Sequence, residues 1–218
     1  MKLVEVIEGT PEWVQWRAGG IGGADAAAIV GLSPWKRARD VWEIKRGEQP
    51  YPSRDDSGWG RRAEPMIRAR YEEALGCAAP PVCCQSERFE WLRASLDGWV
   101  AGRALPVELK GPGRRDHNAA IDGWVPMHYL PQCLHILLAT GAERMHYVSF
   151  NASVPAIDAL VVIRVGRDEQ LLDELRDREQ RFWEALGTTA KAPPPMTAWR
   201  PPRAALARII TRVALPAD

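Results

Sequence analysis

The sequence lacks net charge, long apolar runs and an apolar leader. Its 29 Lys and Arg residues balance 28 Asp and Glu residues, which leaves a net charge of +1. Bulk electrostatics therefore do not indicate a nucleic-acid binder, and a role on DNA would need local patches and a metal site. No apolar stretch approaches the ~18 residues of a membrane span, and acids near the start argue against a signal peptide. We therefore expect a soluble, cytoplasmic protein with no membrane partner.

Side chains with metal-ligand spacing are also scarce. The cysteines contain no C-x-x-C pair, which structural zinc sites and iron–sulfur clusters usually need, so we interpret them as reduced thiols of a cytosolic protein. The histidines lack a short paired spacing, so we interpret each as a surface or core-edge residue. These residues are Cys77, Cys83, Cys84, Cys133, His117, His128, His135 and His146.

The hydrophobic pattern favours one α/β domain. With 218 residues, 46% of them hydrophobic, the chain can bury a core of its own. Residues 1–187 would form a single domain with a mixed central sheet flanked by helices, and the proline-rich residues 188–218 an extension. Helices are predicted near 10–18, 24–32, 37–47, 58–75, 126–140 and 168–187. Strands are predicted near 86–94, 96–102, 105–111, 144–150 and 158–165, with a polar loop at 48–57 and a cysteine-containing loop before residue 86.

One predicted hairpin brings together residues that can hydrolyse a phosphodiester. Asp97 opens its first strand, and Glu108 and Lys110 lie two residues apart on the second. Alternate residues of a strand share a face, so the pair projects together and the hairpin brings Asp97 beside it. Carboxylates of this kind hold magnesium, which neutralises the phosphate and activates water, and Lys110 can orient that water. The alternative is a solvated hairpin with surface charges.

The D…E-x-K spacing is weak by itself, because Glu43-Ile44-Lys45 repeats part of it. That copy lies in a helical pattern, in which residues i and i+2 face different sides. Around Glu108, in contrast, Val107 and Leu109 would face a core, and the glycine–proline turn 111–113 is typical of the rim of a site. The context therefore favours the hairpin.

The segment LDGWVAGRALPVELKGPG (96–113) resembles the catalytic segment of the PD-(D/E)xK nuclease superfamily, and most closely the phage lambda exonuclease and YqaJ-type viral recombinase family. Three further stretches are similar to that family in order and spacing, namely 16–35, 59–73 and 129–150. Four motifs in the right order are far more specific than one. The resemblance implies a restriction-endonuclease-like α/β core.

The resemblance also implies individual roles. Lys110 would position the nucleophile, and Gln132 would orient the lysine or the water. Without the resemblance, Glu64 could equally be an ordinary acid on a helix surface. The implied ligands of Mg²⁺, for which Mn²⁺ would substitute, are Asp97, Glu108, Glu64 and the backbone carbonyl of Leu109.

A pocket for the 5′-phosphate of DNA is implied as well, with Arg17 as its arginine. Ala24 stands where the family often has serine, so one hydroxyl donor would be missing. Backbone N–H groups of the glycine-rich turn could still donate, but Asp25 would oppose an anion unless it points away. The alternative is that Arg17 is a surface residue paired with Glu12 or Asp25.

Trp35 precedes the basic pair Lys36 and Arg37, and it is the tryptophan that we expect to stack on a DNA base. Clusters of basic residues near the motifs are either a DNA track or a solvated face. Besides this pair they comprise Arg39, Arg61, Arg62, Arg68, Arg70, Arg114 and Arg115.

These features predict a Mg²⁺-dependent 5′→3′ exonuclease that digests one strand of linear duplex DNA and leaves 3′ single-stranded tails. The resemblance implies a phage or prophage protein, a trimeric ring and a single-strand annealing protein as partner. Two alternatives stay open. One is a structure- or sequence-specific endonuclease on the same core. The other is a catalytically silent DNA-binding subunit, against which the intact set of Asp97, Glu108 and Lys110 argues.

Overall fold

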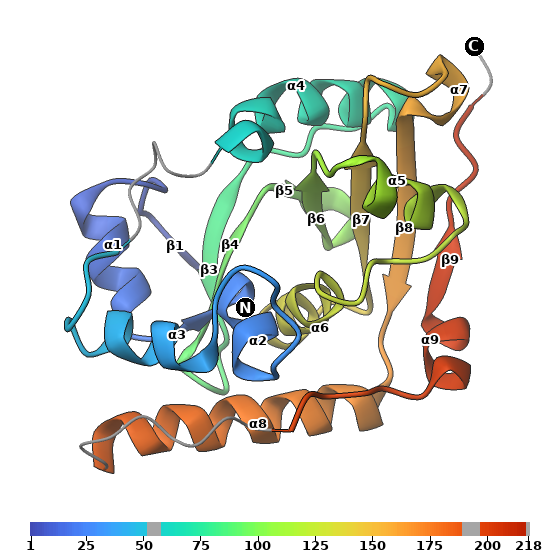
Figure 1. Ribbon diagram of the computed structural model, residues 1–218. Coiled ribbons are helices and arrows are strands. Elements are labelled where there is room, and N and C mark those ends of the chain that lie inside the picture. Colours follow the sequence, from blue (N-terminus) through green and yellow to red (C-terminus); the bar gives the residue numbers. More distant parts are fainter. Residues whose placement is uncertain (52–57, 189–196, 217–218) are drawn as a thin grey trace.

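The computed structural model describes residues 1–51, 58–188 and 197–216. They form two mixed β-sheets that helices cover (Figure 1). The predicted α/β class is confirmed, but two sheets replace the single central sheet that we expected. The division falls between β4 (Leu92–Leu96) and β5 (Gly98–Val100), which pair with different partners. Asp97 therefore lies where the chain passes from one sheet to the other.

The smaller sheet has the strand order β1-β3-β4-β2. Strands β1 (Lys2–Val4), β3 (Val82–Gln85) and β4 are antiparallel, and the short β2 (Ile21–Gly22) pairs parallel with β4. The glycine-rich turn is needed for this pairing, because a Cβ on Gly20 would lie 2.6 Å from the carbonyl oxygen of Trp91. Glycine thus lets β2 approach β4, and β2 fixes the start of the helix that follows it.

The larger sheet has the order β5-β6-β7-β8-β9. Its central strands, β6 (Leu105–Lys110), β7 (Arg144–Phe150) and β8 (Leu160–Gly166), are mostly buried. Only β6 and β7 are parallel, and the other neighbours are antiparallel. Long buried runs are typical of strands covered on both faces, so β6 is held rigidly on either side.

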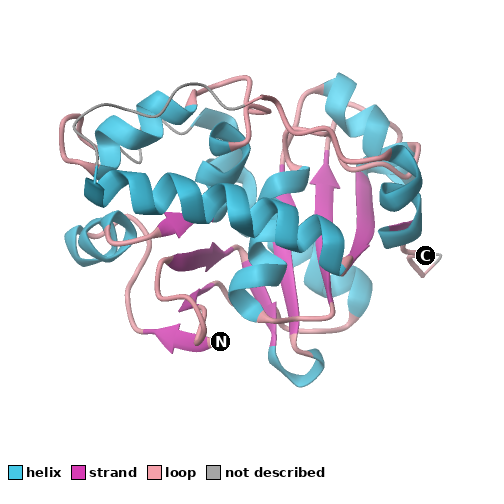
Figure 2. Cartoon of the chain, turned by 90° about the horizontal axis from the view of Figure 1, so that it is seen from below, coloured by secondary structure: helices cyan, strands magenta, loops and turns pink. Residues whose placement is uncertain are grey.

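The helices predicted from sequence are all present, with ends that differ by a few residues. Thr10 caps α1 (Pro11–Ala18) by accepting a hydrogen bond from the Trp13 amide at 3.3 Å. The other predicted helices are α2 (Gly23–Ile29), α3 (Ala38–Lys45), α4 (Gly58–Leu75), α6 (Leu130–Thr140) and α8 (Glu169–Thr188). Helix α8 is the long helix across the front of Figure 2, and it packs on α6 and α2.

Several local predictions were wrong. The cysteine-containing loop includes strand β3, and the strand expected from residue 86 begins only at Leu92. Ser86 is the reason, since its hydroxyl accepts hydrogen bonds from two amides that follow and closes a turn. Helix α5 (Arg114–Ile121) and the short α7 (Ala156–Ala159) were not predicted, whereas the turn of the predicted hairpin is the 3₁₀ helix η2 (Ala101–Arg103).

Three of the four histidines are buried, so their placement at the surface or core edge was wrong. His135 contacts the Glu179 carboxylate at 2.9 Å and the Arg93 carbonyl at 3.0 Å, and thereby ties α6 to α8 and β4. His117 bridges Ser149 and the Asp158 carbonyl, and His146 contacts the hydroxyl of Tyr71. These contacts give the buried rings hydrogen-bond partners, which offset the free-energy cost of removing a polar ring from water.

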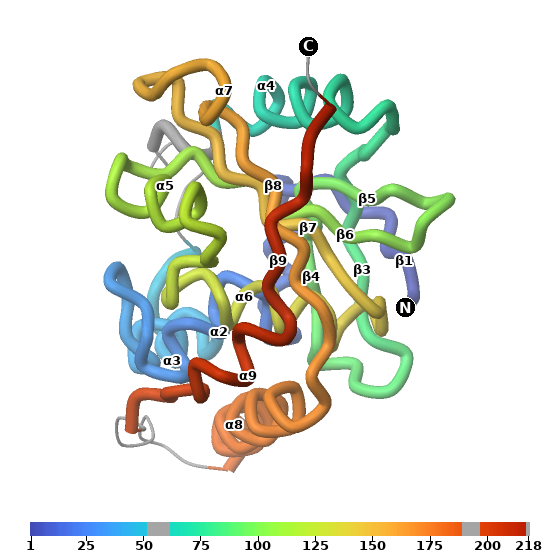
Figure 3. The backbone as a smooth tube through the Cα atoms, turned by 90° about the vertical axis from the view of Figure 1, so that its right-hand side faces the viewer, coloured from blue at the N-terminus to red at the C-terminus, as the bar shows by residue number. Residues whose placement is uncertain are grey.

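The described part of the predicted C-terminal extension packs on the domain. Strand β9 (Ile210–Arg212) pairs with β8, and α9 (Arg203–Ile209) precedes it (Figure 3). Trp199 is buried, and its indole donates to the Glu174 carboxylate at 2.9 Å. Most of the polar loop predicted at 48–57, and the three consecutive prolines of the extension, lie outside the described residues. None of the described helices has the length and apolar character needed to cross a membrane.

Candidate active site

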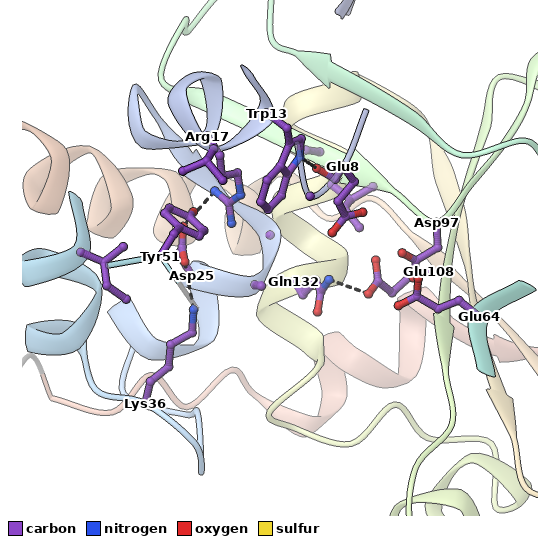
Figure 4. Close-up of a pocket in the computed structure, with 18 of the residues that line it drawn as sticks. Glu8, Trp13, Arg17, Asp25, Lys36, Tyr51, Glu64, Asp97, Glu108 and Gln132 are labelled. Atoms are coloured by element: carbon purple, nitrogen blue, oxygen red, sulfur yellow. Dashed lines mark hydrogen bonds and ion pairs between the residues drawn. The ribbon is translucent and has the colours of Figure 1, made fainter. Parts of the chain in front are cut away.

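The residues singled out for hydrolysis line one pocket of about 380 Å³, here called the carboxylate pocket. Asp97 comes from the crossing between the sheets, Glu108 and Lys110 from β6, Glu64 from α4 and Gln132 from α6. Figure 4 shows the acids gathered at one end of the pocket, with the amide of Gln132 pointing toward them. The tertiary fold therefore brings together all five side chains.

Glu108 is the most constrained of these acids, with only 1% of its surface exposed. Its Oε1 accepts from Lys110 Nζ and from Gln132 Nε2, the latter at 2.5 Å. Its Oε2 is buried, and no donor among the described residues reaches it. Burial raises the pKa of Glu108 to about 8, repulsion from Asp97 adds to the increase, and Lys110 offsets part of it. The alternative of a solvated hairpin is therefore wrong.

Asp97 is fixed in direction by the strand beside it. Its Oδ2 accepts from the Leu109 amide at 2.8 Å, and its carbonyl accepts from Arg68 Nε at 2.8 Å. The side chains of Val107 and Leu109 are buried in the core behind Glu108, as the alternation along β6 predicted. The hairpin thus holds the two carboxylates on the pocket side of the sheet.

Lys110 stays charged in this environment. Burial opposes its charge, but attraction to Glu108 and Asp97 is stronger and raises the pKa of Lys110 above its usual value. The ammonium also lies 5.4 Å from the centre of the Tyr129 ring, a cation–π contact. A permanently charged lysine can orient water or phosphate, whereas it cannot take up a proton.

The acids fit a divalent cation, although no three Asp, Glu, His or Cys groups among the described residues already form a ready-made metal site. The buried Oε2 of Glu108 has no hydrogen-bond donor among the described residues, and Asp97 and Glu64 both raise the pKa of the Glu108 carboxyl. Carboxylate oxygens are the ligands that Mg²⁺ prefers. Leu109 lines an adjoining pocket, and a role for its carbonyl stays a prediction.

The opposite end of the carboxylate pocket is a buried ion cluster around Asp25 (Figure 4). The Asp25 carboxylate contacts Arg17 at 2.9 Å, Lys36 at 3.1 Å and Lys45 at 3.3 Å. It also accepts from the Gly22 amide at 3.2 Å. Burial works against ionisation, yet Arg17 and the lysines outweigh it and hold the pKa of Asp25 well below its usual value. We therefore call these four charged residues the Asp25 cluster.

The cluster decides one alternative for Arg17 in part. The pairing of Arg17 with Asp25 is confirmed, but the expected surface position is wrong, because both side chains are buried. Gly22 makes room for this arrangement, because a Cβ there would lie 1.8 Å from the Arg17 guanidinium carbon. The glycine-rich turn thus allows both the close approach of β2 to β4 and the burial of the Arg17 side chain.

Lys45 is the residue that sequence reasoning missed, because it belongs to the E-x-K copy that was set aside. Its ammonium is buried and donates to the Arg17 carbonyl at 2.7 Å and to Tyr51 Oη at 3.4 Å. Burial lowers the pKa of Lys45 to about 7, although Asp25 partly opposes the change. The signal was present in the sequence, since Lys45 lies one helical turn after the buried Val41 and Trp42.

A second cavity, also of about 380 Å³, adjoins the first and is here called the aromatic pocket. Trp35 lies on it, while Ala24 and Lys36 line both cavities. Arg37 is exposed, and its amide donates to Asp40 at the start of α3 at 2.7 Å. The residues predicted to touch DNA are thus brought together except for Arg37, which lines neither cavity.

The chain is similar to known proteins in sequence and in fold. A family model described as the YqaJ-like viral recombinase domain matches residues 12–143. The uncharacterized protein YqaJ of Bacillus subtilis (strain 168) is 26% identical over 187 residues, which cover 83% of this chain and 58% of that protein. The chain thus spans less than two thirds of this relative.

Solved structures share the fold. An alkaline exonuclease from Laribacter hongkongensis, LHK-Exo, is 21% identical with a TM-score of 0.69, and the match covers 82% of this chain and 93% of that one. Its complex with dAMP gives a TM-score of 0.70. A phage-related exonuclease from Haemophilus somnus 129PT is 12% identical with a TM-score of 0.54, covering 74% and 90%. The family predicted from the four sequence motifs is confirmed.

Proposed function

This chain belongs to the YqaJ-like viral recombinase family, and on that premise we propose that it is a metal-dependent nuclease that hydrolyses DNA. The observation that carries the proposal is the buried, unpartnered Oε2 of Glu108 in a pocket shared with Asp97 and Glu64. Such an oxygen is costly to keep charged unless a cation binds it.

Each side chain of the pocket has a distinct task in this proposal. A divalent cation held by Asp97, Glu108, Glu64 and the Leu109 carbonyl would supply charge neutralisation at the phosphate and an activated water. Gln132 holds Glu108 in place through their hydrogen bond. Lys110, charged and anchored by Glu108, orients the attacking water toward phosphorus. We propose Mg²⁺ as the physiological cation, with Mn²⁺ as a substitute, because every ligand is an oxygen.

We further propose that the enzyme digests linear duplex DNA from its 5′ ends and leaves 3′ tails. The Asp25 cluster supports this proposal, because Arg17 and Lys36 line the same pocket as the acids and can receive a terminal phosphate. Arginine suits a phosphate through two parallel hydrogen bonds. The dAMP complex of LHK-Exo is consistent with a mononucleotide product. By family resemblance, the tails would pass to a single-strand annealing protein, and the enzyme would be a trimeric ring acting in the host cytoplasm.

The assay compares linear and covalently closed duplex DNA with magnesium. Linear DNA should be consumed and closed circles should resist, whereas rapid linearisation of circles would assign the endonuclease alternative. Asp97→Asn should abolish cleavage, because it removes the negative charge. The asparagine side chain can still accept the hydrogen bond from the Leu109 backbone N–H, so the local structure should be kept. Lys110→Ala should slow cleavage strongly with little loss of metal binding. The control Glu90→Gln changes an exposed acid that lines neither pocket and should leave the rate unchanged. Full activity of Asp97→Asn would contradict the proposed site.

Arg17 tests the 5′-end proposal separately. Arg17→Ala should slow digestion of 5′-phosphorylated ends much more than that of 5′-hydroxyl ends, measured as initial rates on matched duplexes. Equal slowing of digestion at both kinds of end would contradict the proposed phosphate pocket, and only the proposal of a metal-dependent nuclease core would stand.

A further inference from the structure

The aromatic pocket opens beside the proposed catalytic lysine. It shares Lys110, Gln132, Glu64 and Lys36 with the carboxylate pocket, and Trp35, His128 and Tyr129 line its other side. A ligand in the aromatic pocket therefore lies next to any phosphate held by Lys110 and Lys36. The two cavities are two halves of one binding region.

Trp35 is exposed over 67% of its surface, yet contacts hold it in place. Its amide donates to the Ser33 hydroxyl at 3.2 Å. Its ring meets His128 edge to face at 5.0 Å and lies 5.6 Å from Tyr129 at an angle of 32°. An exposed indole fixed in this way offers a flat apolar surface at little further cost in side-chain entropy.

The supporting side chains are themselves anchored. Tyr129 packs on the buried Tyr147 at 5.9 Å, and His128 Nε2 lies 3.3 Å from the Asp116 carboxylate. Tyr129 also carries the Lys110 ammonium over its ring. One aromatic residue thus contacts both the catalytic lysine and the ring of Trp35, and this couples the two halves of the region.

We propose that the aromatic pocket binds the base of the deoxynucleotide whose phosphate lies beside Lys110, with Trp35 as the stacking surface. This inference rests on the proposed nuclease function. A nucleotide combines a planar aromatic group with an anion, and the pocket combines exposed aromatic rings with Lys36 and Lys110. Stacking tolerates every base, because each base has a π-face. The site therefore fits a nuclease that must accept any sequence.

Binding of mononucleotides without added metal tests the site independently of cleavage. The probes are dGMP and deoxyribose 5-phosphate, which differ only by the base, and calorimetry gives their affinities. The wild-type protein should bind dGMP about tenfold more tightly than deoxyribose 5-phosphate, because only dGMP has a base that can stack on Trp35. Trp35→Ala should remove this difference, whereas Trp35→Phe should keep most of it.

Tryptophan fluorescence adds a second readout. We expect dGMP to quench the wild-type emission, and the quenching should disappear in Trp35→Phe while binding persists. The control Trp183→Phe changes a tryptophan on α8 that lines neither pocket, and it should keep the quenching.

Equal affinity of the wild-type protein for the two probes would overturn the proposal. It would also be overturned if Trp35→Ala changed the oligomeric mass instead of base binding, because a second copy of the chain would then cover Trp35. Neither result would affect cleavage of linear DNA with magnesium by the wild-type protein, which tests the nuclease function alone.

Discussion

Two buried carboxylates at opposite ends of one pocket differ in how their charge is balanced. Asp25 is 4% exposed and contacts three cationic side chains and a backbone amide. Glu108 is 1% exposed and contacts one cation and one amide, with one oxygen unpartnered. The pKa of Asp25 is lowered, and that of Glu108 is raised to about 8. Similar burial therefore gives opposite chemistry. Cations outnumber the carboxylate at the Asp25 end, whereas the Glu108 carboxylate at the other end can accept a cation.

The largest expected effect comes from neutralising Glu108. Glu108→Gln should reduce cleavage with magnesium by roughly a thousandfold or more, because it neutralises a proposed metal ligand. Near neutral pH the metal-free protein should lose little stability, since a pKa of about 8 leaves most of the Glu108 carboxyl protonated and uncharged. Thermal unfolding and a gel assay of the same variant measure the two effects.

The pH dependence of stability sharpens this prediction. The folded pKa of Glu108, about 8, lies above the ordinary value of 4.5, so between these values the folded state binds more protons than the unfolded state. Stability of the metal-free wild type should therefore fall as pH rises through that range. Glu108→Gln should flatten the fall, and an unchanged slope would mean that Glu108 is not the group responsible.

Neutralising Asp25 should have the opposite consequence for stability. Asp25→Asn removes the shared partner of Arg17, Lys36 and Lys45. Breaking a buried ion pair typically costs about 3–5 kcal/mol, and chemical denaturation should show a loss of this size. Asp40→Asn is the control, because asparagine can keep the hydrogen bond from the Arg37 amide. Loss of the negative charge at this helix start should cost only about 0.3–1 kcal/mol. Similar losses for the two variants would contradict the clustered role of Asp25.

Lys45 should produce a smaller effect that depends on pH. Its folded pKa of about 7 lies below the ordinary 10.5, so between these values the unfolded state binds more protons. The contribution of Lys45 to the free energy of unfolding should therefore rise as the pH increases from about 7 to 10.5. Lys45→Met keeps a long side chain of similar shape and should remove the rise, as measured by denaturation at several pH values. If the stability of Lys45→Met still rose with pH as much as that of the wild type, another group would be responsible for the pH dependence.

The smallest change tests the missing hydroxyl beside the Asp25 cluster. Ala24 is exposed and lines both pockets, so Ala24→Ser adds a donor without crowding the core. A hydrogen bond to a charged group contributes at most about 1.5–3 kcal/mol, and we expect a several-fold gain in preference for 5′-phosphorylated over 5′-hydroxyl ends. An unchanged ratio of initial rates would place the terminal phosphate elsewhere.

The sequence by itself determined the hairpin with Asp97, Glu108 and Lys110, because strand alternation and a tight turn are local properties. It also determined the family, through four motifs in order, and most of the helices, through their periodicity. The roles of Glu64 and Gln132 were assigned by resemblance, since each residue reaches the pocket from a separate helix.

Only the tertiary structure decided which charges meet. Lys45 lies 20 residues or more from Arg17 and Asp25 in the chain, and packing of α1, α2 and α3 brings the three together. The division into two sheets and the pairing of β9 with β8 likewise depend on contacts between distant segments. The raised pKa of Glu108 has the same origin, because it results mainly from burial. Which helices and strands bury a side chain is decided by tertiary packing and not by the local sequence.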